Sequence, residues 1–474
     1  MTKQNKSSPA VFQKLPSIDT LLKEPELEGL IAEAGRQVVV ETLRGAVEQF
    51  RQLLVTKPNA DIDQKGIYRK IIEDTKQSVK ATMSPYFRKV VNATGIILHT
   101  GLGRAVLSAK ALQQIQEELS GYSLLQIGIE TGKRSKRDEF IERLLHQLTG
   151  AEAATVVNNN AAATSIVLNT VAKGKEVIVS RGQLVEIGGS FRLPDVMAFS
   201  GAKLVEVGTT NKTHARDYVN AITENTAAIL RVHPSNYKIQ GFSSEVPLDE
   251  LVEIAHSHEL VMIDDVGAGA LIDFSQFGFE PEPTLADSVR TGADIVTSSA
   301  DKLIGASQGG IILGKTRLIE AVRKNQFARI VRVGKMTLAV LEATLKLFLD
   351  ESKALREVPT LQMLMRDGSE IKEQAELLVM QLKKGISNAA VETICGFSQM
   401  GSGSLPAQNL ATTLVAIRPA KISAESLAKH LRQYDTPIFA RIQNDQVLFD
   451  PRTLLAGDDE ILLEALPKIL GRGQ

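Results

Sequence analysis

From Val90 onward the chain alternates short apolar runs with longer stretches of helical periodicity, and this alternation limits its fold more than any other feature. Strands separated by helices form βαβ units, which build a mostly parallel sheet covered on both faces. The sequence therefore predicts an α/β domain with its active site at the carboxyl ends of the strands. The expected strands cover residues 153–157, 176–180, 203–207, 227–232, 260–265, 293–298 and 309–313.

Three regions of different periodicity divide the 474-residue chain, a length that suits two to four domains. In residues 1–80, apolar side chains such as Val39 and Leu43 recur every three or four positions, which predicts a small helical domain. The α/β pattern fills residues 81–335. Residues 336–474 mix strands and helices, which predicts a smaller α+β domain. Its strands are expected near residues 390–397, 412–417, 438–442 and 446–449.

Composition excludes several classes of protein. Lys and Arg number 55 and Asp and Glu number 55, so the chain carries no uniformly basic coat for nucleic acid, although a segregated basic face is compatible with this balance. The single cysteine, Cys395, excludes an intrachain disulfide and a cysteine-based zinc cluster. No secretory signal and no membrane-length apolar stretch is visible in the sequence, so we expect a cytoplasmic protein without a metal site.

An asparagine-rich turn follows the first expected strand and opens a helix at residues 161–172. Asn159, Asn160 and Ala161 would place backbone N–H groups at the positive end of that helix, where a phosphate binds readily. An ordinary capped helix without a ligand would have the same sequence. By itself, this segment therefore does not distinguish a phosphate site from an ordinary capped helix.

Two other segments supply an acid and a lysine at strand ends. Asp265 ends the expected strand 260–265, and Ser299 and Lys302 follow the strand 293–298. Pyridoxal phosphate (PLP) enzymes hold the cofactor on a lysine as a Schiff base and pair its ring nitrogen with an acid. We therefore expect Lys302 to bind PLP and act as general base and acid. Asp265 is expected at the ring nitrogen, and Ser299, Asn159, Asn160 and Ala161 at the phosphate.

Glu186 is a weaker cofactor candidate. It follows the expected strand 176–180 and is flanked by glycines, which would let it approach the face of the cofactor ring. A turn acid exposed to solvent fits the same pattern.

Arginines form a further set of candidates. Arg104 follows a glycine-rich turn, Arg134 lies in the basic cluster 133–137, and Arg329 and Arg332 are three residues apart. Charge clusters usually cover solvated faces, but a forked guanidinium also suits phosphate and other oxyanions. An anionic substrate or an RNA backbone is therefore compatible with these positions.

Several long motifs resemble those of bacterial selenocysteine synthase, the L-seryl-tRNA(Sec) selenium transferase family, over nearly the whole chain. The motifs occupy residues 15–22 (LPSIDTLL), 92–104 (NATGIILHTGLGR), 158–163 (NNNAAA), 180–196 (SRGQLVEIGGSFRLPDV), 207–214 (VGTTNKTH), 233–242 (HPSNYKIQGF), 335–338 (KMTL) and 401–406 (GSGSLP).

This resemblance implies a PLP-dependent enzyme of fold type I, the aspartate-aminotransferase-like fold. Such an enzyme converts seryl-tRNA(Sec) to selenocysteinyl-tRNA(Sec) through an aminoacrylyl intermediate, with selenophosphate as selenium donor. The resemblance assigns Lys302 to the PLP lysine and Asp265 to the ring nitrogen. It assigns Arg104, Arg134, Arg329 and Arg332 to the donor anion. It also implies a tRNA-recognising N-terminal helical domain and a homodecamer built of dimers.

Two other readings stay open at the level of the sequence. A related PLP lyase, aldolase or racemase would act on a free amino acid, and a non-catalytic RNA-binding protein would have lost the cofactor. Ala300, where the family usually has glycine, leaves room for a paralogue with a different second substrate. The acid that protonates the leaving hydroxyl is also open between Lys302, His99 and a water.

Overall fold

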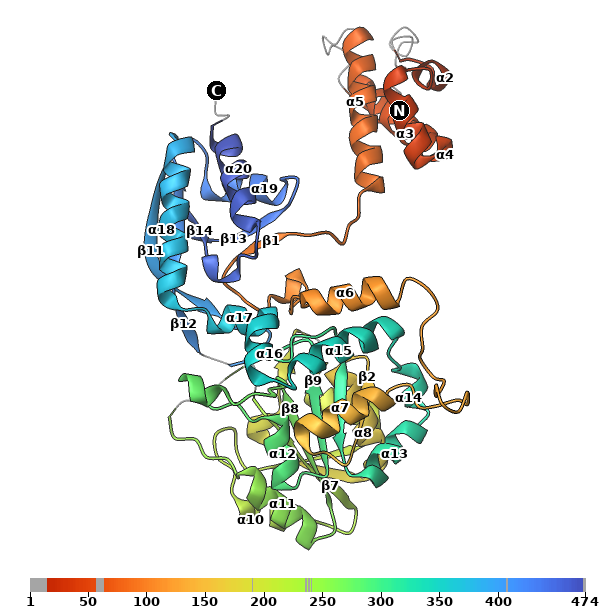
Figure 1. The fold of residues 1–474 in the computed structure, drawn as a ribbon, viewed down its shortest axis with the longest axis vertical. Helices are drawn as coiled ribbons and strands as arrows, with labels where there is room; N and C mark the ends of the chain where they lie inside the picture. The colour runs from red at the N-terminus through yellow and green to blue at the C-terminus, as the bar shows by residue number, and fades with distance from the viewer. Residues whose placement is uncertain are drawn as a thin grey trace, which may run out of the picture. The chain divides into compact units, whose positions relative to one another are not determined.

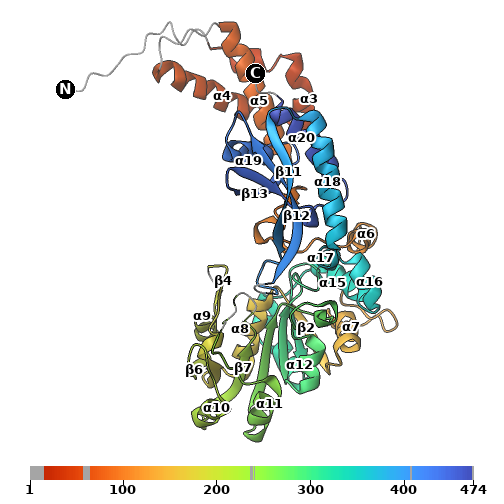
Figure 2. The same ribbon diagram turned by 90° about the vertical axis from the view of Figure 1, so that its left-hand side faces the viewer.

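The structure is a computed structural model, and it describes residues 15–56, 64–189, 191–234, 237, 239, 241–405 and 408–471. The chain forms two compact units, residues 1–89 and 90–474 (Figures 1 and 2). The predicted boundaries after residues 80 and 335 stay predictions. No helix in the described residues has the length and apolar character needed to cross a membrane.

The first unit is helical. It contains α2 (Ile18–Leu21), α3 (Pro25–Ala34), α4 (Arg36–Thr56) and α5 (Gln64–Met83). The apolar stripe of α4 packs on α5, because residues three or four positions apart share one face of a helix. The core of this unit is a single cluster that includes Leu21, Leu27, Val39, Leu43, Leu54, Ile67, Ile71 and Val79.

A seven-stranded sheet forms the centre of the second unit, in the order β2-β10-β9-β8-β7-β3-β6. All of its strands run parallel except β10, which is antiparallel to both β2 and β9. Parallel neighbours need a long crossover connection, usually through a helix. The connection from β9 to β10 contains no helix, so β10 returns antiparallel to β9. The seven strands are β2 (Ala153–Val157), β3 (Glu176–Ser180), β6 (Lys203–Val207), β7 (Thr226–Val232), β8 (Val261–Gly267), β9 (Ile295–Ser299) and β10 (Gly310–Gly314).

Helices cover both faces of this sheet, as expected for apolar strands in a parallel arrangement. The α8 helix (Asn160–Val171) packs with α9 (Leu193–Ser200) and α13 (Thr316–Lys324) in one apolar cluster. The opposite face is covered by α7 (Glu139–Thr149), α10 (Ala215–Ala221), α11 (Leu248–Ser257), α12 (Leu285–Thr291) and α15 (Lys335–Leu347) (Figures 1 and 2).

A second, five-stranded sheet has the order β1-β13-β14-β12-β11. The four expected strands of the C-terminal region are present. The fifth, β1 (Val91–Ala93), comes from the start of the unit and pairs in parallel with β13. The strands and the helices packed on them are β11 (Ala389–Gln399), β12 (Asn409–Pro419), β13 (Ile438–Gln443), β14 (Gln446–Phe449), α18 (Gly368–Gly385), α19 (Ala424–Arg432) and α20 (Asp458–Leu470).

The remaining elements are short connections. They are α6 (Ala109–Glu118), α14 (Phe327–Ile330), α16 (Glu351–Glu357), α17 (Pro359–Met365), the hairpin of β4 (Glu186–Ile187) and β5 (Phe191–Arg192), and the 3-10 helices η1 (Thr100–Leu102), η2 (Arg181–Gln183), η3 (Phe274–Phe277) and η4 (Pro451–Thr453).

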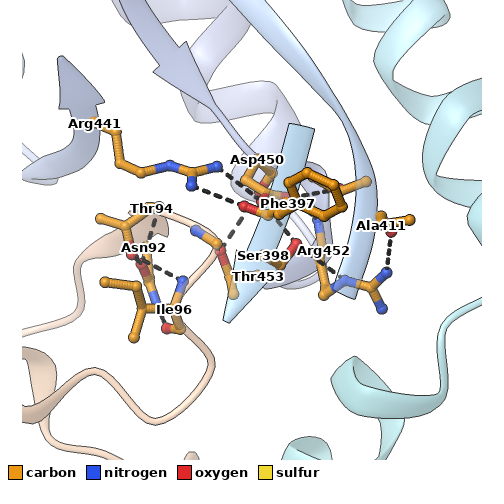
Figure 3. Close-up of polar contacts among 12 residues, drawn as sticks. Asn92, Thr94, Ile96, Phe397, Ser398, Ala411, Arg441, Asp450, Arg452 and Thr453 are labelled. Carbon is orange, nitrogen blue, oxygen red and sulfur yellow. Dashed lines mark hydrogen bonds and ion pairs between the residues drawn. The ribbon is translucent and has the colours of Figure 1, made fainter. Parts of the chain in front are cut away.

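A buried polar network joins the start of the unit to the second sheet (Figure 3). The Asp450 carboxylate is fully buried and accepts hydrogen bonds from Ser398 Oγ (2.8 Å), Thr412 Oγ1 (2.9 Å) and Arg441 Nη2 (3.2 Å). Gly95 lies against this carboxylate, with a φ of 71°. A Cβ at that position would lie 2.0 Å from Asp450 Oδ2. Only glycine fits there, and the network thereby positions the segment that leads to Arg104.

Candidate active site

Lys302 lies in the connection from β9 to β10, and only 6% of its surface is exposed. Leu303 and Ile304 next to it belong to the apolar core. Burial, and next the positive charge of Arg104, lower the pKa of the Lys302 amine. A lysine in this state has a larger neutral fraction, which is the form that attacks a carbonyl.

Asp265, in β8, is buried next to this lysine and is held by two side chains of α8. Asn160 Nδ2 donates to Oδ1 (2.7 Å) and Thr164 Oγ1 donates to Oδ2 (2.9 Å). Burial raises the pKa of the Asp265 carboxyl, while both hydrogen bonds and the charge of Lys302 oppose that rise. Thr164 was not among the sequence candidates. Its signal is its spacing of four residues from Asn160, which places both on one face of α8.

The expected phosphate segment begins α8, as the sequence suggested. Asn159 is the N-cap, and its Oδ1 accepts the Ala162 N–H (2.9 Å). The N–H groups of Asn160 and Ala161 lie in the first turn, where a helix offers them no internal acceptor. The side-chain amide of Asn160 points to Asp265, so only its backbone is available for a phosphate.

Ser299, the last residue of β9, is buried opposite Gly310 in the antiparallel pair with β10. A Cβ on Gly310 would lie 2.1 Å from the carbonyl oxygen of Asn159. This close approach of backbones brings the Ser299 strand end and the start of α8 together.

Arg104 is the predicted arginine whose positive charge acts on Lys302. Its Nη1 donates to Asp301 Oδ2 (2.6 Å), and its backbone is left-handed, with a φ of 61°. The Arg104 N–H donates to the His99 carbonyl oxygen (3.0 Å), and His99 Nδ1 is buried without a partner among the described residues. Asp301 was not predicted as a site residue, although its position next to Lys302 is visible in the sequence. Its burial is visible only in the structure.

His233 and Glu282 form a second pair that the sequence did not indicate. His233 follows β7, and its N–H donates to the Asp265 carbonyl oxygen (2.9 Å). Its Nε2 lies 3.0 Å from Glu282 Oε2, and Glu282 Oε1 accepts the Leu405 N–H (3.0 Å). These three residues come from distant parts of the chain, so no local pattern predicts their contact.

The other three predicted arginines are not among the charges that shift the pKa of Lys302. Arg332 pairs with Val157 at the end of β2, and Arg329 is exposed on α14. Arg134 is exposed in the loop before α7. Burial, and then the charges of Arg332 and Arg134, lower the pKa of Arg137, so these three cations lie near one another. Their role toward an anion stays a prediction.

Glu186 lies on the β4–β5 hairpin. Its Oε2 is 3.3 Å from Arg192 Nε, and 57% of its side chain is exposed. The structure therefore places it in an exposed ion pair on a hairpin, and a role at the cofactor ring stays a prediction.

Comparison with known proteins places this site in a family. The family described as "L-seryl-tRNA selenium transferase" matches residues 90–455, and the one described as "Selenocysteine synthase N terminal" matches residues 12–51. The chain belongs to the L-seryl-tRNA selenium transferase family. The resemblance seen in the sequence motifs is thereby confirmed.

Family members with this name are similar over almost their full length. The L-seryl-tRNA(Sec) selenium transferase of Alkaliphilus metalliredigens (strain QYMF) is 46% identical over 460 residues, which cover 97% of this chain and 98% of that relative. The enzyme of the same name from Alkaliphilus oremlandii (strain OhILAs) is 44% identical and covers 97% of this chain and 99% of that relative.

A solved structure supports the fold. The chain is similar to D-glucosaminate-6-phosphate ammonia-lyase with a TM-score of 0.55 and 21% identity, over 82% of this chain and 99% of that chain. The predicted fold type I, the α/β fold of PLP-dependent enzymes, is confirmed.

The residues at this site fit PLP, the cofactor of the family. An acid and a lysine with opposite pKa shifts face one another in the interior. Buried polar atoms without a partner among the described residues occur beside them, at Asn160 Oδ1 and His233 Nδ1. Buried polar groups normally have partners, so these atoms are suited to a polar ligand.

Proposed function

We propose that this chain converts L-seryl-tRNA(Sec) to L-selenocysteinyl-tRNA(Sec), with PLP as cofactor and selenophosphate as selenium donor. The observation that carries the proposal is the buried Lys302 beside Arg104, which is held by Asp301. A lysine amine suits a carbonyl cofactor, and an adjacent guanidinium suits an oxyanion. Exchange of a serine hydroxyl for selenium from an anionic donor needs both groups in one site.

Residues at the strand ends would hold the cofactor. Lys302 Nζ would bond to its aldehyde carbon, and Asp265 would face its ring nitrogen. The N–H groups of Asn160 and Ala161, with Asn159 and Ser299, would surround its phosphate. Burial raises the pKa of Asp265. The positive charge of the ring nitrogen would lower it again, because an adjacent opposite charge favours the ionised carboxylate.

When bound, PLP supplies an electron sink for the electron pair left on Cα of serine. Lys302 would take the Cα proton, since its lowered pKa increases the neutral fraction of its amine. Asp265 would keep the proton on the ring nitrogen in place through its negative charge. Lys302 and His99 are both candidates for protonating the leaving hydroxyl, which departs as water.

Arg104 would orient the selenium donor. Its Nη1 is engaged by Asp301, and the guanidinium has further N–H groups for an oxyanion. Arg134, Arg329 and Arg332 would add positive charge toward the same anion. Glu186 would approach the ring face from its hairpin.

The helical unit up to Lys89 would recognise the tRNA, because it is a compact unit separate from the cofactor site. The chain would assemble as a homodecamer of dimers, like the family that its motifs resemble. Because its proposed substrate is a charged tRNA, the chain would act in the cytoplasm.

The visible absorption spectrum of the purified holoenzyme tests the proposal. We expect a cofactor band that shifts when seryl-tRNA(Sec) is added and does not shift with free serine. Lys302→Ala should abolish the lysine-bound cofactor band, which makes it the matched control.

A band that responds only to a free amino acid would contradict the proposal and would indicate a lyase, aldolase or racemase. A protein that takes up no PLP would contradict it as well, in favour of a non-catalytic RNA-binding protein.

A further inference from the structure

A cavity of about 590 Å³ lies beside the Asp265–Lys302 site, at the same edge of the central sheet. Residues that follow β3, β6 and β7 line it, including Gln183, Thr210 and His233. All these strands are parallel, so their carboxyl ends share one edge with those of β8 and β9. The cavity is therefore placed to hold a part of the substrate.

Two contacts connect this cavity to the reacting groups. His233 lines the cavity, and its backbone N–H donates to the Asp265 carbonyl oxygen (2.9 Å). Glu282 also lines it, and its charge acts on the pKa of Lys302. A substrate bonded near Lys302 can thus extend directly into the cavity.

The size of the cavity exceeds what a serine residue needs. Its volume of about 590 Å³ is within the range of pockets that enclose whole small molecules. In a charged tRNA the serine is an ester of the terminal ribose, so the group that follows serine into the site is the 3′-terminal nucleoside.

The lining suits a nucleoside. Tyr237 presents an aromatic ring that is fixed by a hydrogen bond from its hydroxyl to the Gly182 carbonyl oxygen. Gln183 Oε1 accepts the Val232 N–H (3.1 Å), which fixes this side-chain amide at the wall of the cavity. Aromatic rings stack on bases, and amides and hydroxyls bind base edges and the 2′-hydroxyl.

The charge of the lining separates a nucleoside from an anion. Glu245, Glu280 and Glu282 carry three negative charges, and Lys212 and His233 are the basic residues among the described lining residues. An anionic donor or a run of phosphates would be repelled here, whereas a neutral nucleoside would not. Lys212 alone could meet the single phosphate that joins this nucleoside to the rest of the RNA.

We propose that this cavity is the binding site for the neutral 3′-terminal nucleoside of the charged tRNA. The proposal rests on the proposed function. It assigns the nucleoside to the carboxyl ends of β3, β6 and β7 and leaves the anionic selenium donor to Arg104. The site would thereby select an aminoacyl ester over free serine.

Ser244→Trp is a variant that fills the cavity. Ser244 lines it, and its backbone is held on both sides, by the bond from its N–H to the Asn211 carbonyl oxygen (2.9 Å) and from the Thr213 N–H to its own carbonyl oxygen (2.9 Å). A bulky side chain on this fixed backbone is expected to occupy part of the cavity that Ser244 lines. Ser387→Trp is the matched control, since Ser387 is exposed between α18 and β11.

Calorimetry on the holoenzyme would compare two stable probes, 3′-deoxy-3′-(L-serylamino)adenosine and L-serine methylamide. We expect the wild type and Ser387→Trp to bind the nucleoside probe about tenfold more tightly or better, because base stacking contributes on this scale. Ser244→Trp should lose this advantage and keep its affinity for the methylamide.

Equal affinity of the wild type for both probes would overturn the proposal. So would an unchanged advantage in Ser244→Trp, or a changed oligomeric state in that variant by mass photometry, which would make the cavity a subunit contact. If the wild type converts seryl-tRNA(Sec) but shows no nucleoside advantage, only this inference fails. If it does not convert seryl-tRNA(Sec), the proposed function fails first.

Discussion

Lys302 and Asp265 show how single residues acquire reactivity from their surroundings. Both are almost fully buried, and burial disfavours the charged form of each. The pKa of Lys302 is lowered by burial and by Arg104, while the charges of Asp265 and Asp301 oppose this shift. The protonation of Lys302 therefore depends on burial and one guanidinium, which lower its pKa, and on the carboxylates around it, which raise it.

This balance predicts opposite effects for two substitutions. Arg104→Gln removes a positive charge and leaves Asp301 unpaired, so the pKa of Lys302 should rise and cofactor attachment should need a higher pH. Asp301→Asn removes a negative charge, so the pKa should fall and attachment should extend to lower pH. The measurement is the rate at which the apoenzyme gains the lysine-bound cofactor band, as a function of pH.

Arg317→Gln provides a control for the loss of one positive charge, because Arg317 is exposed on α13. Its pH profile should match that of the wild type. If Arg104→Gln and Asp301→Asn shifted the profile in the same direction, the assigned balance of charges would be wrong.

At the scale of elements, α8 combines two tasks. Its N-terminus carries the N–H groups that we propose for the cofactor phosphate, and its next turn carries Thr164, which with Asn160 holds the Asp265 carboxylate. Asn159 starts the helix at this point because its side chain caps the Ala162 N–H. In the proposed site, one helix would thereby set the distance between the phosphate end and the ring-nitrogen end of the cofactor.

Thr164→Val should weaken PLP binding by ~10- to 100-fold, because it removes a hydrogen bond to a charged, buried group. Without that bond the pKa of Asp265 rises further, and the carboxylate holds the ring nitrogen less well. Equilibrium dialysis of the purified apoenzyme against PLP measures the effect.

Thr170→Val is the matched control for this prediction, since Thr170 lies on the same helix and its hydroxyl bonds to the Ile166 carbonyl oxygen and to the Asn325 side chain, away from Asp265. It should leave PLP affinity within about twofold of the wild type, as expected for a site remote from the carboxylate. Equal losses in both variants would mean that α8 is merely destabilised.

At the scale of the molecule, the two compact units predict separable tasks. Removal of residues 1–89 should leave a folded 90–474 unit that still binds PLP, because that unit has its own cores. Its KM for seryl-tRNA(Sec) should rise by about 100-fold or more, since linked binding modules gain affinity on this scale. Circular dichroism, the cofactor band and steady-state kinetics check the three parts.

An unchanged KM in the truncated chain would assign tRNA recognition to the 90–474 unit. A truncated chain that no longer takes up PLP would show that the helical unit supports the cofactor site.

The sequence by itself determined the elements whose signals are local. Apolar runs separated by stretches of helical periodicity predicted the seven strands of the central sheet. The positions of Lys302 and Asp265 at the ends of such runs made them the candidate cofactor residues. The carboxyl ends of parallel strands meet at one edge, so the order of elements was enough to bring these two together.

The tertiary structure alone decided the contacts between distant segments. In the tertiary structure β10 runs antiparallel to its neighbours and β1 pairs within the C-terminal sheet. Glu282 contacts both His233 and Leu405. The tertiary structure also set Thr164 on Asp265 and Arg104 on Asp301. Such contacts depend on strand register and on backbones that approach within a few ångströms, as Gly95 does at Asp450, and no local pattern of residues encodes them.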